Sequence, residues 1–273
     1  MTDGIGQTTG APADKRATPA ASTDPDALRI SHIAKRFGAV IALRDVNLHV
    51  GQGEILGLIG DNGAGKSTLI KIMTGFQPPD AGTITVNGQE VRLRSVEYAR
   101  SLGIETVYQD LALVNELSVY HNLFLKRELT YAPLPFLNNR AMRKKARESL
   151  DAMGINIPSV DVEVAKLSGG QRQAIAIARA ISSNAQILLL DEPLAAMGAK
   201  EGALILDLIR RLKGTGVSVI MIGHNYAQVL EVCDRVCLLQ QGKITLDKPV
   251  AGDMLTELNE IVMREYRTAA TQH

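Results

Sequence analysis

Residues 54–75 read EILGLIGDNGAGKSTLIKIMTG and contain three structural signals in succession. Residues 54–60 are almost wholly apolar, which is typical of a strand that is covered on both faces of a sheet. Residues 60–68 match the P-loop pattern, in which two spaced glycines are followed by lysine and serine. Residues 66–75 have helical spacing and end on Gly75, a favourable helix end. The succession of strand, glycine-rich loop and helix predicts a loop that binds phosphate.

The residue types in this loop suit a nucleotide and its Mg²⁺. Glycines allow backbone N–H groups to surround phosphate oxygens, and the start of the following helix adds a partial positive charge. Lys66 is expected to reach the β- and γ-phosphates, while Ser67 offers a hydroxyl to Mg²⁺ and Thr68 contacts the phosphates beside it. The alternative is an ordinary glycine-rich turn. The predicted nucleotide-binding residues are Gly60, Asp61, Asn62, Gly63, Ala64, Gly65, Lys66, Ser67 and Thr68.

A second apolar run, ILLLDEP at residues 187–193, ends in two adjacent carboxylates. One carboxylate beside the phosphate loop is needed to hold Mg²⁺, usually through water, and Asp191 is the candidate. The other, Glu192, is free of the metal and can polarise the attacking water as a general base. Because the pair follows the P-loop by more than a hundred residues, at a strand end, it predicts hydrolysis of the nucleotide and not binding alone.

Strand and helix patterns alternate along most of the chain, which predicts an α/β fold with a largely parallel central sheet. Strand patterns are found in residues 28–37 and 46–50, and Asn87-Gly88 between strand-like flanks indicates a hairpin. From about 112 to 181 the strand signal fades and helix-like segments follow, so this block is predicted to be a helical insert. Strands return in AQILLLDE and VSVIMIG, and RVCLLQQGKITL indicates a final hairpin.

Composition narrows the class of protein. The chain has 273 residues, enough for one large domain with a well-buried core. Its net charge of +1 gives no sign of a nucleic-acid partner, and its 2 cysteines, Cys233 and Cys237, are expected to be inert, buried thiols in a reducing cytosol.

No apolar run reaches the roughly 18 residues of a membrane span. Residues 1–27, rich in Ala, Thr, Pro and Gly, are predicted to be a disordered leader, and residues 267–273 a flexible tail.

A basic run lies on one predicted helix of the insert. It has two interpretations, a solvated helix face or a contact with a lipid headgroup or a partner. Its members are Arg140, Arg143, Lys144, Lys145 and Arg147, and the apolar positions of the same helix are Met142, Ala146, Leu150 and Met153.

LSGGQRQ, residues 167–173, resembles the signature motif of ABC transporter ATPases when it is taken together with the P-loop. The resemblance covers residues 28–266 and implies ATP, Mg²⁺ and a P-loop NTPase (RecA-like) core with an N-terminal antiparallel β subdomain and the helical insert. Ser168 opens a helix whose N–H groups form an anion site. In the family this half-site closes on the γ-phosphate bound by the other subunit; an ordinary N-cap is the alternative. Its residues here are Ser168, Gly169, Gly170 and Gln171.

Three further positions resemble family residues in their order along the chain. Gln109 in VYQD is similar to the Q-loop glutamine near Mg²⁺ and the attacking water, and His224 in IGHN to the switch histidine that contacts the γ-phosphate. Phe37 in KRFG is similar to the aromatic residue that stacks on adenine, with a core Phe as the alternative. The resemblance implies a catalytic set of Lys66, Gln109, Glu192 and His224, and a metal set of Ser67, Gln109 and Asp191.

Two departures from the family pattern indicate a particular branch. Gly198 stands where the D-loop commonly ends in Asp, which puts close communication between two sites in doubt. Asn225 replaces the Asp that commonly follows the switch histidine. The same substitutions resemble the cassettes of bacterial importers for ribose, xylose and fructose.

This resemblance implies the partners of the chain. A single cassette needs a second copy, so a homodimer is expected beneath integral-membrane permease subunits, on the cytoplasmic face of the inner membrane. A periplasmic sugar-binding protein would deliver the substrate, and the leading hypothesis is the ATPase of a monosaccharide importer. The alternatives are an ABC transporter for another small solute, a soluble ABC protein that acts on ribosomes or in DNA repair, and a regulatory cassette that binds ATP without hydrolysing it.

Overall fold

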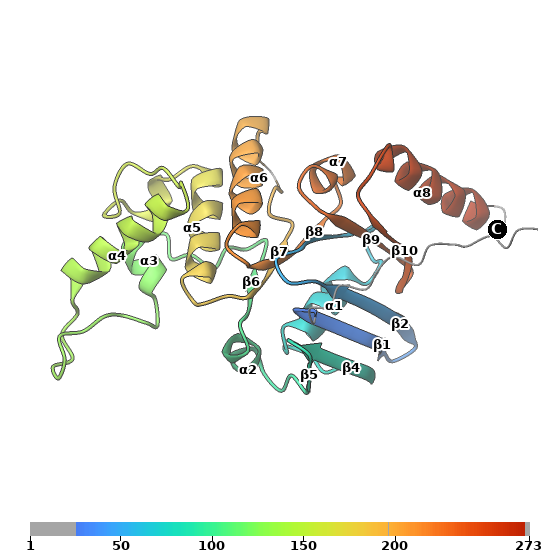
Figure 1. Ribbon diagram of the computed structural model, residues 1–273, viewed down its shortest axis with the longest axis horizontal. Coiled ribbons are helices and arrows are strands. Elements are labelled where there is room, and N and C mark those ends of the chain that lie inside the picture. The colour runs from blue at the N-terminus through green and yellow to red at the C-terminus, as the bar shows by residue number, and fades with distance from the viewer. Residues whose placement is uncertain (1–25, 196, 271–273) are drawn as a thin grey trace, which may run out of the picture.

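The computed structural model describes residues 26–195 and 197–270, with side chains as far as 264, and contains two β-sheets and a helical insert (Figure 1). The first sheet is wholly antiparallel, with the strand order β2-β1-β4-β5. The predicted hairpin is confirmed between β4 and β5, where Asn87 and Gly88 have φ of 49° and 77°. The strands are β1 (Leu28–Phe37), β2 (Val40–Val50), β4 (Ala81–Val86) and β5 (Gln89–Val91).

The second sheet is the predicted parallel one and has the order β10-β9-β3-β8-β7-β6. All its strands run parallel except β10, which pairs antiparallel with β9 and forms the predicted final hairpin. Every residue of β3 and β8 is buried, which explains their continuous apolar sequences. The strands are β3 (Ile55–Ile59), β6 (Ile104–Val107), β7 (Ile187–Asp191), β8 (Ser218–Gly223), β9 (Arg235–Gln240) and β10 (Lys243–Pro249).

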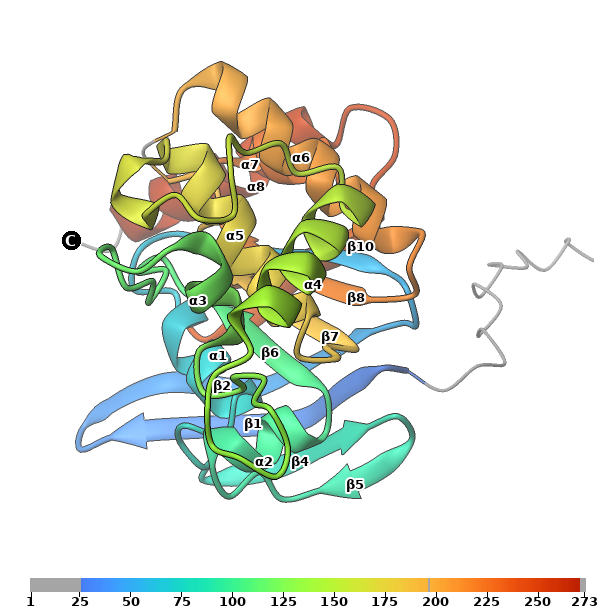
Figure 2. The same cartoon turned by 90° about the vertical axis from the view of Figure 1, so that its left-hand side faces the viewer.

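Helices flank the sheets, and a separate group forms the predicted helical insert, which projects from one end of the molecule (Figure 1, Figure 2). Inside the insert, α3 and α4 begin at polar caps, since Ser118 and Asn138 accept the N–H groups of His121 and Ala141. The insert contains α3 (Val119–Phe124), α4 (Asn139–Ala152), the 3₁₀ turn Val164–Lys166 and α5 (Gly169–Ile181). The other helices are α1 (Lys66–Met73), α2 (Val96–Ser101), α6 (Ala199–Lys213), α7 (Tyr226–Leu230) and α8 (Met254–Ala270).

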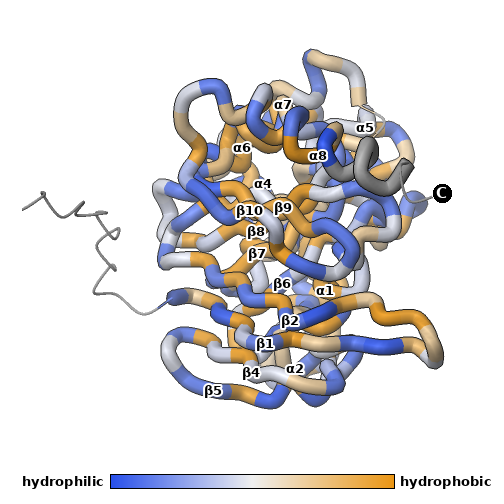
Figure 3. The backbone as a smooth tube through the Cα atoms, turned by 90° about the vertical axis from the view of Figure 1, so that its right-hand side faces the viewer, coloured by the Kyte–Doolittle hydropathy of each residue, from blue (hydrophilic) through white to orange (hydrophobic). Residues whose placement is uncertain are grey.

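The central sheet separates two hydrophobic clusters, because alternate residues of each strand point to opposite faces. In β7, Leu188 and Leu190 belong to the cluster that extends into the insert, while Ile187 and Leu189 belong to the cluster shared with α1 and the antiparallel sheet. Figure 3 shows apolar segments gathered in the central strands and polar segments in many of the outer loops. The core of the central sheet therefore holds the strand ends, where the site lies, in fixed positions.

Three predictions concern features away from the sheets. Cys233 and Cys237 are both buried, as predicted, and burial raises the pKa of each thiol and so disfavours the reactive thiolate. Residues 1–25 of the predicted leader and 271–273 of the predicted tail lie outside the described residues, while α8 continues to Ala270. Within the described part of the chain, no helix combines the length and the apolar character needed to cross a membrane.

Arg235 of β9 joins the two sheets and provides a stability prediction. Its side chain is only 11% exposed, and it donates to Glu54 at 2.7 Å and to the backbone oxygen of His49 in β2 at 2.5 Å. It also pairs with Asp247. Because Arg235→Ala leaves two carboxylates unpaired in a partly buried site, we expect it to lower the free energy of unfolding by about 3–5 kcal/mol in urea titrations.

The matched control for Arg235 is Arg210→Ala. Arg210 also bonds two carboxylates, those of Asp207 and Glu231, both at 2.7 Å, but its side chain is 41% exposed. Water screens such pairs, so we expect this replacement to cost less than about 1 kcal/mol. Equal losses for the two variants would disprove the special role of Arg235 between the sheets.

Candidate functional site

The predicted site residues follow strands whose carboxyl ends meet at one edge of the central sheet. Parallel register pairs Ile59 of β3 with Gly223 of β8, and Asp191 of β7 with Ile222 of β8. β6 pairs in parallel with β7, so its end lies at the same edge. The segments that leave these strands carry the P-loop after β3, Gln109 after β6, Glu192 after β7 and His224 after β8.

Lys66 is held inside the loop that precedes α1. The residue is 8% exposed, and its Nζ donates to the backbone oxygens of Gly60 at 2.5 Å and Asp61 at 2.9 Å. Burial lowers the pKa of Lys66, while the negative charges of Glu192, Asp61 and Asp191 oppose this shift. The P-loop lysine therefore lies in the electric field of both carboxylates at the end of β7.

Gly60 allows the loop to pass close to β9. It has a φ of 153°, and a Cβ added there would lie 2.2 Å from the backbone oxygen of Leu239. Because both strain and overlap result, we expect Gly60→Ala to lower the free energy of unfolding by about 2–4 kcal/mol in urea titrations. Gly63→Ala is the control, since Gly63 has a φ of 82° but an added Cβ meets nothing within 4 Å. We expect it to cost about 1 kcal/mol, and a larger loss there than at Gly60 would refute this account of the loop.

Asp191 and Glu192 have different environments at the end of β7. Asp191 is half-buried, and burial together with the charge of Glu192 raises its pKa, while the charge of Lys66 lowers it. Glu192 has a left-handed φ of 50°, a conformation that costs energy in a residue other than glycine. Its N–H donates to Ile222 of β8 at 3.0 Å. This turn places Glu192 beside the end of β8, in an environment different from that of Asp191.

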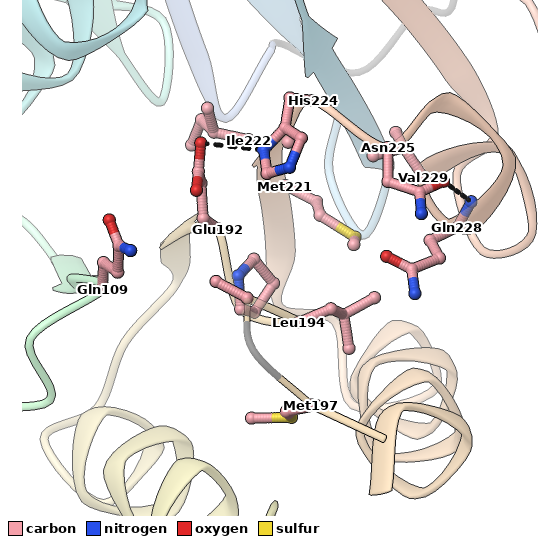
Figure 4. Close-up of a pocket in the computed structure, with 13 residues that line it drawn as sticks. Gln109, Glu192, Leu194, Met197, Met221, Ile222, His224, Asn225, Gln228 and Val229 are labelled. Atoms are coloured by element: carbon pink, nitrogen blue, oxygen red, sulfur yellow. Dashed lines mark hydrogen bonds and ion pairs between the residues drawn. The ribbon is translucent and has the colours of Figure 1, made fainter. Parts of the chain in front are cut away.

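Glu192 and His224 meet across the ends of β7 and β8. Glu192 Oε1 lies 3.1 Å from His224 Nδ1, and Figure 4 shows this contact at one side of a cavity of about 420 Å³. Gln109, from the segment after β6, lines the same cavity. The structure thus brings together Gln109, Glu192 and His224. Lys66 interacts electrostatically with the same group, since the negative charge of Glu192 raises the pKa of Lys66 against the effect of burial.

Other residues of the cavity wall were not predicted from the sequence. Met197, Met221 and Gln228 line the cavity, and nothing in their sequence spacing indicates a shared site. Asn225 also lines it, and its side chain caps α7 by accepting the N–H of Gln228 at 3.3 Å. Asn and Asp cap helices about equally well, which explains why Asn suffices here. Gly198 precedes α6 without a side-chain cap, so the missing D-loop carboxylate has no substitute at that position.

The predicted signature residues lie at the start of α5, in the helical insert. Ser168 Oγ accepts the N–H of Gln171 at 3.3 Å, and Gln171 Oε1 accepts the N–H of Ser168 at 3.0 Å, which completes a capping box. The N-cap interpretation of Ser168 is therefore confirmed as its part in the local fold. Within the described chain, none of residues 168–171 lines the cavity beside Glu192.

Phe37 ends β1 as an exposed side chain. The residue is 48% exposed, which excludes the alternative of a core Phe. Lys35 Nζ lies 5.8 Å from the ring centroid and bonds Asp80 at 2.6 Å. The ring is therefore accessible to a planar ligand from the solvent side.

The predicted metal residues fit Mg²⁺ in its usual protein setting. Mg²⁺ binds through one or two carboxylates together with substrate phosphates and water, and does not need an all-protein cage. The described residues contain no group of three His, Cys, Asp or Glu side chains that would form such a cage. Asp191, half-buried and within the field of Lys66, and Ser67, in the first turn of α1, carry oxygen atoms of the kind that would hold such an ion.

Fold and site together define a class of protein. A parallel sheet with a P-loop after one strand and a carboxylate pair after another is the architecture of a P-loop nucleotide hydrolase. The sequence profile of the family described as "ABC transporter" matches residues 43–195, and the chain belongs to this family. ATP hydrolysis is the activity of the family, so the chain is an ATP-binding and ATP-hydrolysing cassette.

Curated relatives include three ATP-binding proteins of sugar importers. The xylose/arabinose import ATP-binding protein of Sulfolobus acidocaldarius is 46% identical over 87% of this chain and 94% of its own length. The fructose import ATP-binding protein of Rhizobium meliloti is 42% identical over 77% of this chain and 84% of its own. The ribose import ATP-binding protein of Chromobacterium violaceum is 38% identical over 84% of this chain and 45% of its own, so the chain spans less than half of that protein.

Solved structures of ATP-binding cassettes share this fold. A cassette of an ABC transporter in its ADP conformation has a TM-score of 0.73 and 27% identity, over 82% of this chain and 91% of that one. A dimeric cassette in a post-hydrolysis state, with ADP and phosphate, has a TM-score of 0.68 and 26% identity, over 82% of this chain and 99% of that one. The predicted fold, a P-loop core with an antiparallel β subdomain and a helical insert, is thereby confirmed.

Proposed function

We propose that this chain is the ATP-hydrolysing subunit of an ABC importer for a monosaccharide of the ribose, xylose or fructose type. The observation that carries the proposal is its identity of 38–46% to three ATP-binding proteins named for the import of such sugars. The match to the xylose/arabinose protein spans nearly all of that protein, so the likeness includes the whole cassette and not the P-loop alone. Gly198 and Asn225 support the same branch, because sugar-importer cassettes have similar departures from the family pattern.

ATP binding is assigned to the loop of residues 60–68. In this proposal Lys66 offsets the negative charge of the β- and γ-phosphates, and Phe37 stacks on the adenine ring. Ser67 and Asp191 would hold Mg²⁺ together with Gln109, and the bound metal would supply positive charge to the phosphate oxygens.

Hydrolysis is assigned to the residues that face the cavity. Glu192 accepts a proton from the attacking water, which is the part of a general base. His224 contacts the Glu192 carboxylate at 3.1 Å, which supports a role in orienting that base. In this proposal His224 also contacts the γ-phosphate. Gln109, which lines the same cavity, would orient the attacking water. The left-handed turn at Glu192 supports this assignment, because strained backbone of this kind is concentrated at functional sites.

The proposed assembly is a homodimer held under permease subunits. Ser168, Gly169, Gly170 and Gln171 of one copy would close on the γ-phosphate bound by the P-loop of the other, as the N–H groups at the start of α5 favour an anion. A dimeric cassette of the same fold, with ADP and phosphate, supports this arrangement. The chain would lie on the cytoplasmic face of the inner membrane, and a periplasmic sugar-binding protein would deliver the substrate.

Reconstitution of the chain with permease subunits of a monosaccharide importer tests the proposed function. In proteoliposomes supplied with ATP and the sugar-binding protein, we expect uptake of labelled ribose, xylose or fructose and a rate of ATP hydrolysis that rises with transport. Uptake of another small solute and of none of these sugars would contradict the monosaccharide proposal. ATP binding without turnover, with and without the permease, would favour the regulatory cassette.

A further inference from the structure

An ordered hairpin between α3 and α4 presents a group of apolar side chains to solvent. Thr130 and Leu137 form an antiparallel bridge, and the Tyr131 N–H donates to the backbone oxygen of Phe136 at 2.9 Å. Residues 131–137, here called the apolar tip, contain no charged residue and lie at the outer end of the insert (Figure 1). Four of its side chains are between 46% and 66% exposed, namely Tyr131, Leu134, Phe136 and Leu137.

The shape and chemistry of the apolar tip indicate an interaction surface. Single exposed apolar residues are normal on proteins, but a contiguous group marks contact with a protein or a membrane. The Leu134 N–H donates to the Tyr131 oxygen at 2.6 Å, which closes a tight turn at the end of the hairpin. The tip therefore protrudes. Its shape is suited to insertion into a protein or a membrane surface and not to the binding of a small ligand.

The helix that follows the apolar tip carries an excess of positive charge. α4 contains five cations, of which Arg143 bonds Asp161 at 2.5 Å and Lys144 lies 3.8 Å from Glu148. Its other three cations have no ion pair among the described residues, and they are Arg140, Lys145 and Arg147. The helical rise spreads these three over about 10 Å next to the tip.

The position of Arg140 is unfavourable for the helix itself. A helix has a partial positive charge at its N-terminus, so a cation in its first turn lowers its stability. α4 has no acidic residue in its first turn, and its acids, Glu148 and Asp151, both lie in its second half. Helix stability therefore does not explain the charge pattern, whereas an external negative surface next to the tip does.

We propose that the apolar tip and the first two turns of α4 dock on a lipid bilayer that contains anionic headgroups. Apolar side chains flanked by basic residues bind membrane interfaces, with the apolar groups at the acyl boundary and the cations among the headgroups. Long, unpaired cations spread along a helix suit a diffuse layer of negative charge, while a protein partner would need a groove matched to the tip. The proposal rests on the proposed function for the presence of the chain at a membrane.

Vesicle sedimentation of the purified chain tests this contact without permease or sugar. Vesicles of phosphatidylcholine alone are compared with vesicles of phosphatidylcholine and phosphatidylglycerol at low salt. We expect binding to the anionic vesicles only, and binding that weakens as salt is added. The variant Leu134→Ser/Phe136→Ser is expected to lower the partition by about tenfold or more. Each replacement in Arg140→Glu/Lys145→Glu removes a cation and adds an anion, so it is expected to lower the partition by more than about fivefold for each residue replaced.

Two matched variants control for apolar exposure and for charge. Phe76→Ser removes an exposed aromatic residue (67% exposed) outside the insert, and Arg92→Glu/Arg94→Glu reverses two exposed charges between β5 and α2. Both are expected to bind vesicles like the unaltered chain, and an ATP-induced rise in melting temperature checks that each variant is folded.

Three results would overturn the membrane contact. Equal binding to both vesicle types would show that binding does not depend on the anionic headgroups. Unchanged binding by the tip variant would show that it does not depend on the apolar tip. Cross-linking from position 136 to a permease or to a second copy, in place of lipid, would assign the tip to a protein partner. None of these outcomes involves sugar uptake, so each leaves the proposed importer function to its own test.

Discussion

Glu192→Gln is expected to abolish nearly all ATP hydrolysis while ATP binding stays close to that of the unaltered chain. A general base contributes typically about 10²–10⁴-fold to a rate, and the amide of Gln cannot take the proton of the attacking water. The replacement keeps the size of the side chain, and the amide is still able to bond His224, whose Nδ1 lies 3.1 Å from Glu192 Oε1. The loss should therefore appear in the chemical step and not in the affinity for ATP.

Single-turnover hydrolysis and a nucleotide titration separate these two effects. Excess chain mixed with labelled ATP and Mg²⁺ reports the chemical step, and a fluorescence titration reports ATP affinity. Glu231→Gln is the matched control, because Glu231 is paired with Arg210 at 2.7 Å on the surface and is not among the residues that line the cavity. We expect normal turnover in the control. Near-normal turnover in Glu192→Gln would rule out the general-base role of Glu192.

The phosphate loop could be predicted because its signals are local. The strand, the glycines and the helix start lie within 22 residues of sequence, and each restricts the backbone at its own position. The hairpin at Asn87-Gly88 is similar, since both residues adopt the positive φ that a tight turn requires. The order of strands and helices followed from the same kind of local pattern, and so did the parallel central sheet.

The end of α3 shows where local patterns fail. Helical spacing continues through residues 118–129, but the helix ends at Phe124, and Lys126 adopts a left-handed φ of 64°. The fully buried Asn122 bonds both backbone groups of Val114, at 2.8 and 3.0 Å, an arrangement that helical spacing does not reveal. Tertiary contacts therefore overrule the periodic pattern in this part of the insert.

The candidate site was predicted as a set of residues but not as a geometry. Glu192 and His224 belong to separate motifs, and their contact depends on the parallel register between β7 and β8. Met221 and Gln228 join the cavity only because β8 and α7 fold against the segment after β7. Motifs thus indicate which side chains take part, whereas the register of the sheet decides which of them touch.

Mixing two inactive variants is expected to restore ATP hydrolysis, because each proposed site is built from two chains. Lys66→Ala removes the phosphate-binding lysine, and Ser168→Arg places a large side chain at the start of α5, so neither homodimer has an intact site. A mixed dimer has one, formed by the P-loop of the Ser168→Arg chain and the signature of the Lys66→Ala chain. Random pairing makes about half of the dimers mixed, so we expect about a quarter of the wild-type rate of phosphate release.

The size of the recovery also reports how the two sites communicate. Gly198 supplies no carboxylate and no side-chain cap at the start of α6, which favours sites that work independently and hence the full quarter. Strict coupling between sites would reduce the recovery below that value. Lys66→Ala mixed with Ser67→Ala is the control and should stay inactive, since both changes damage the P-loop. Normal hydrolysis by the Ser168→Arg homodimer alone would contradict the two-chain site and would limit Ser168 to the capping box with Gln171, at 3.0 and 3.3 Å.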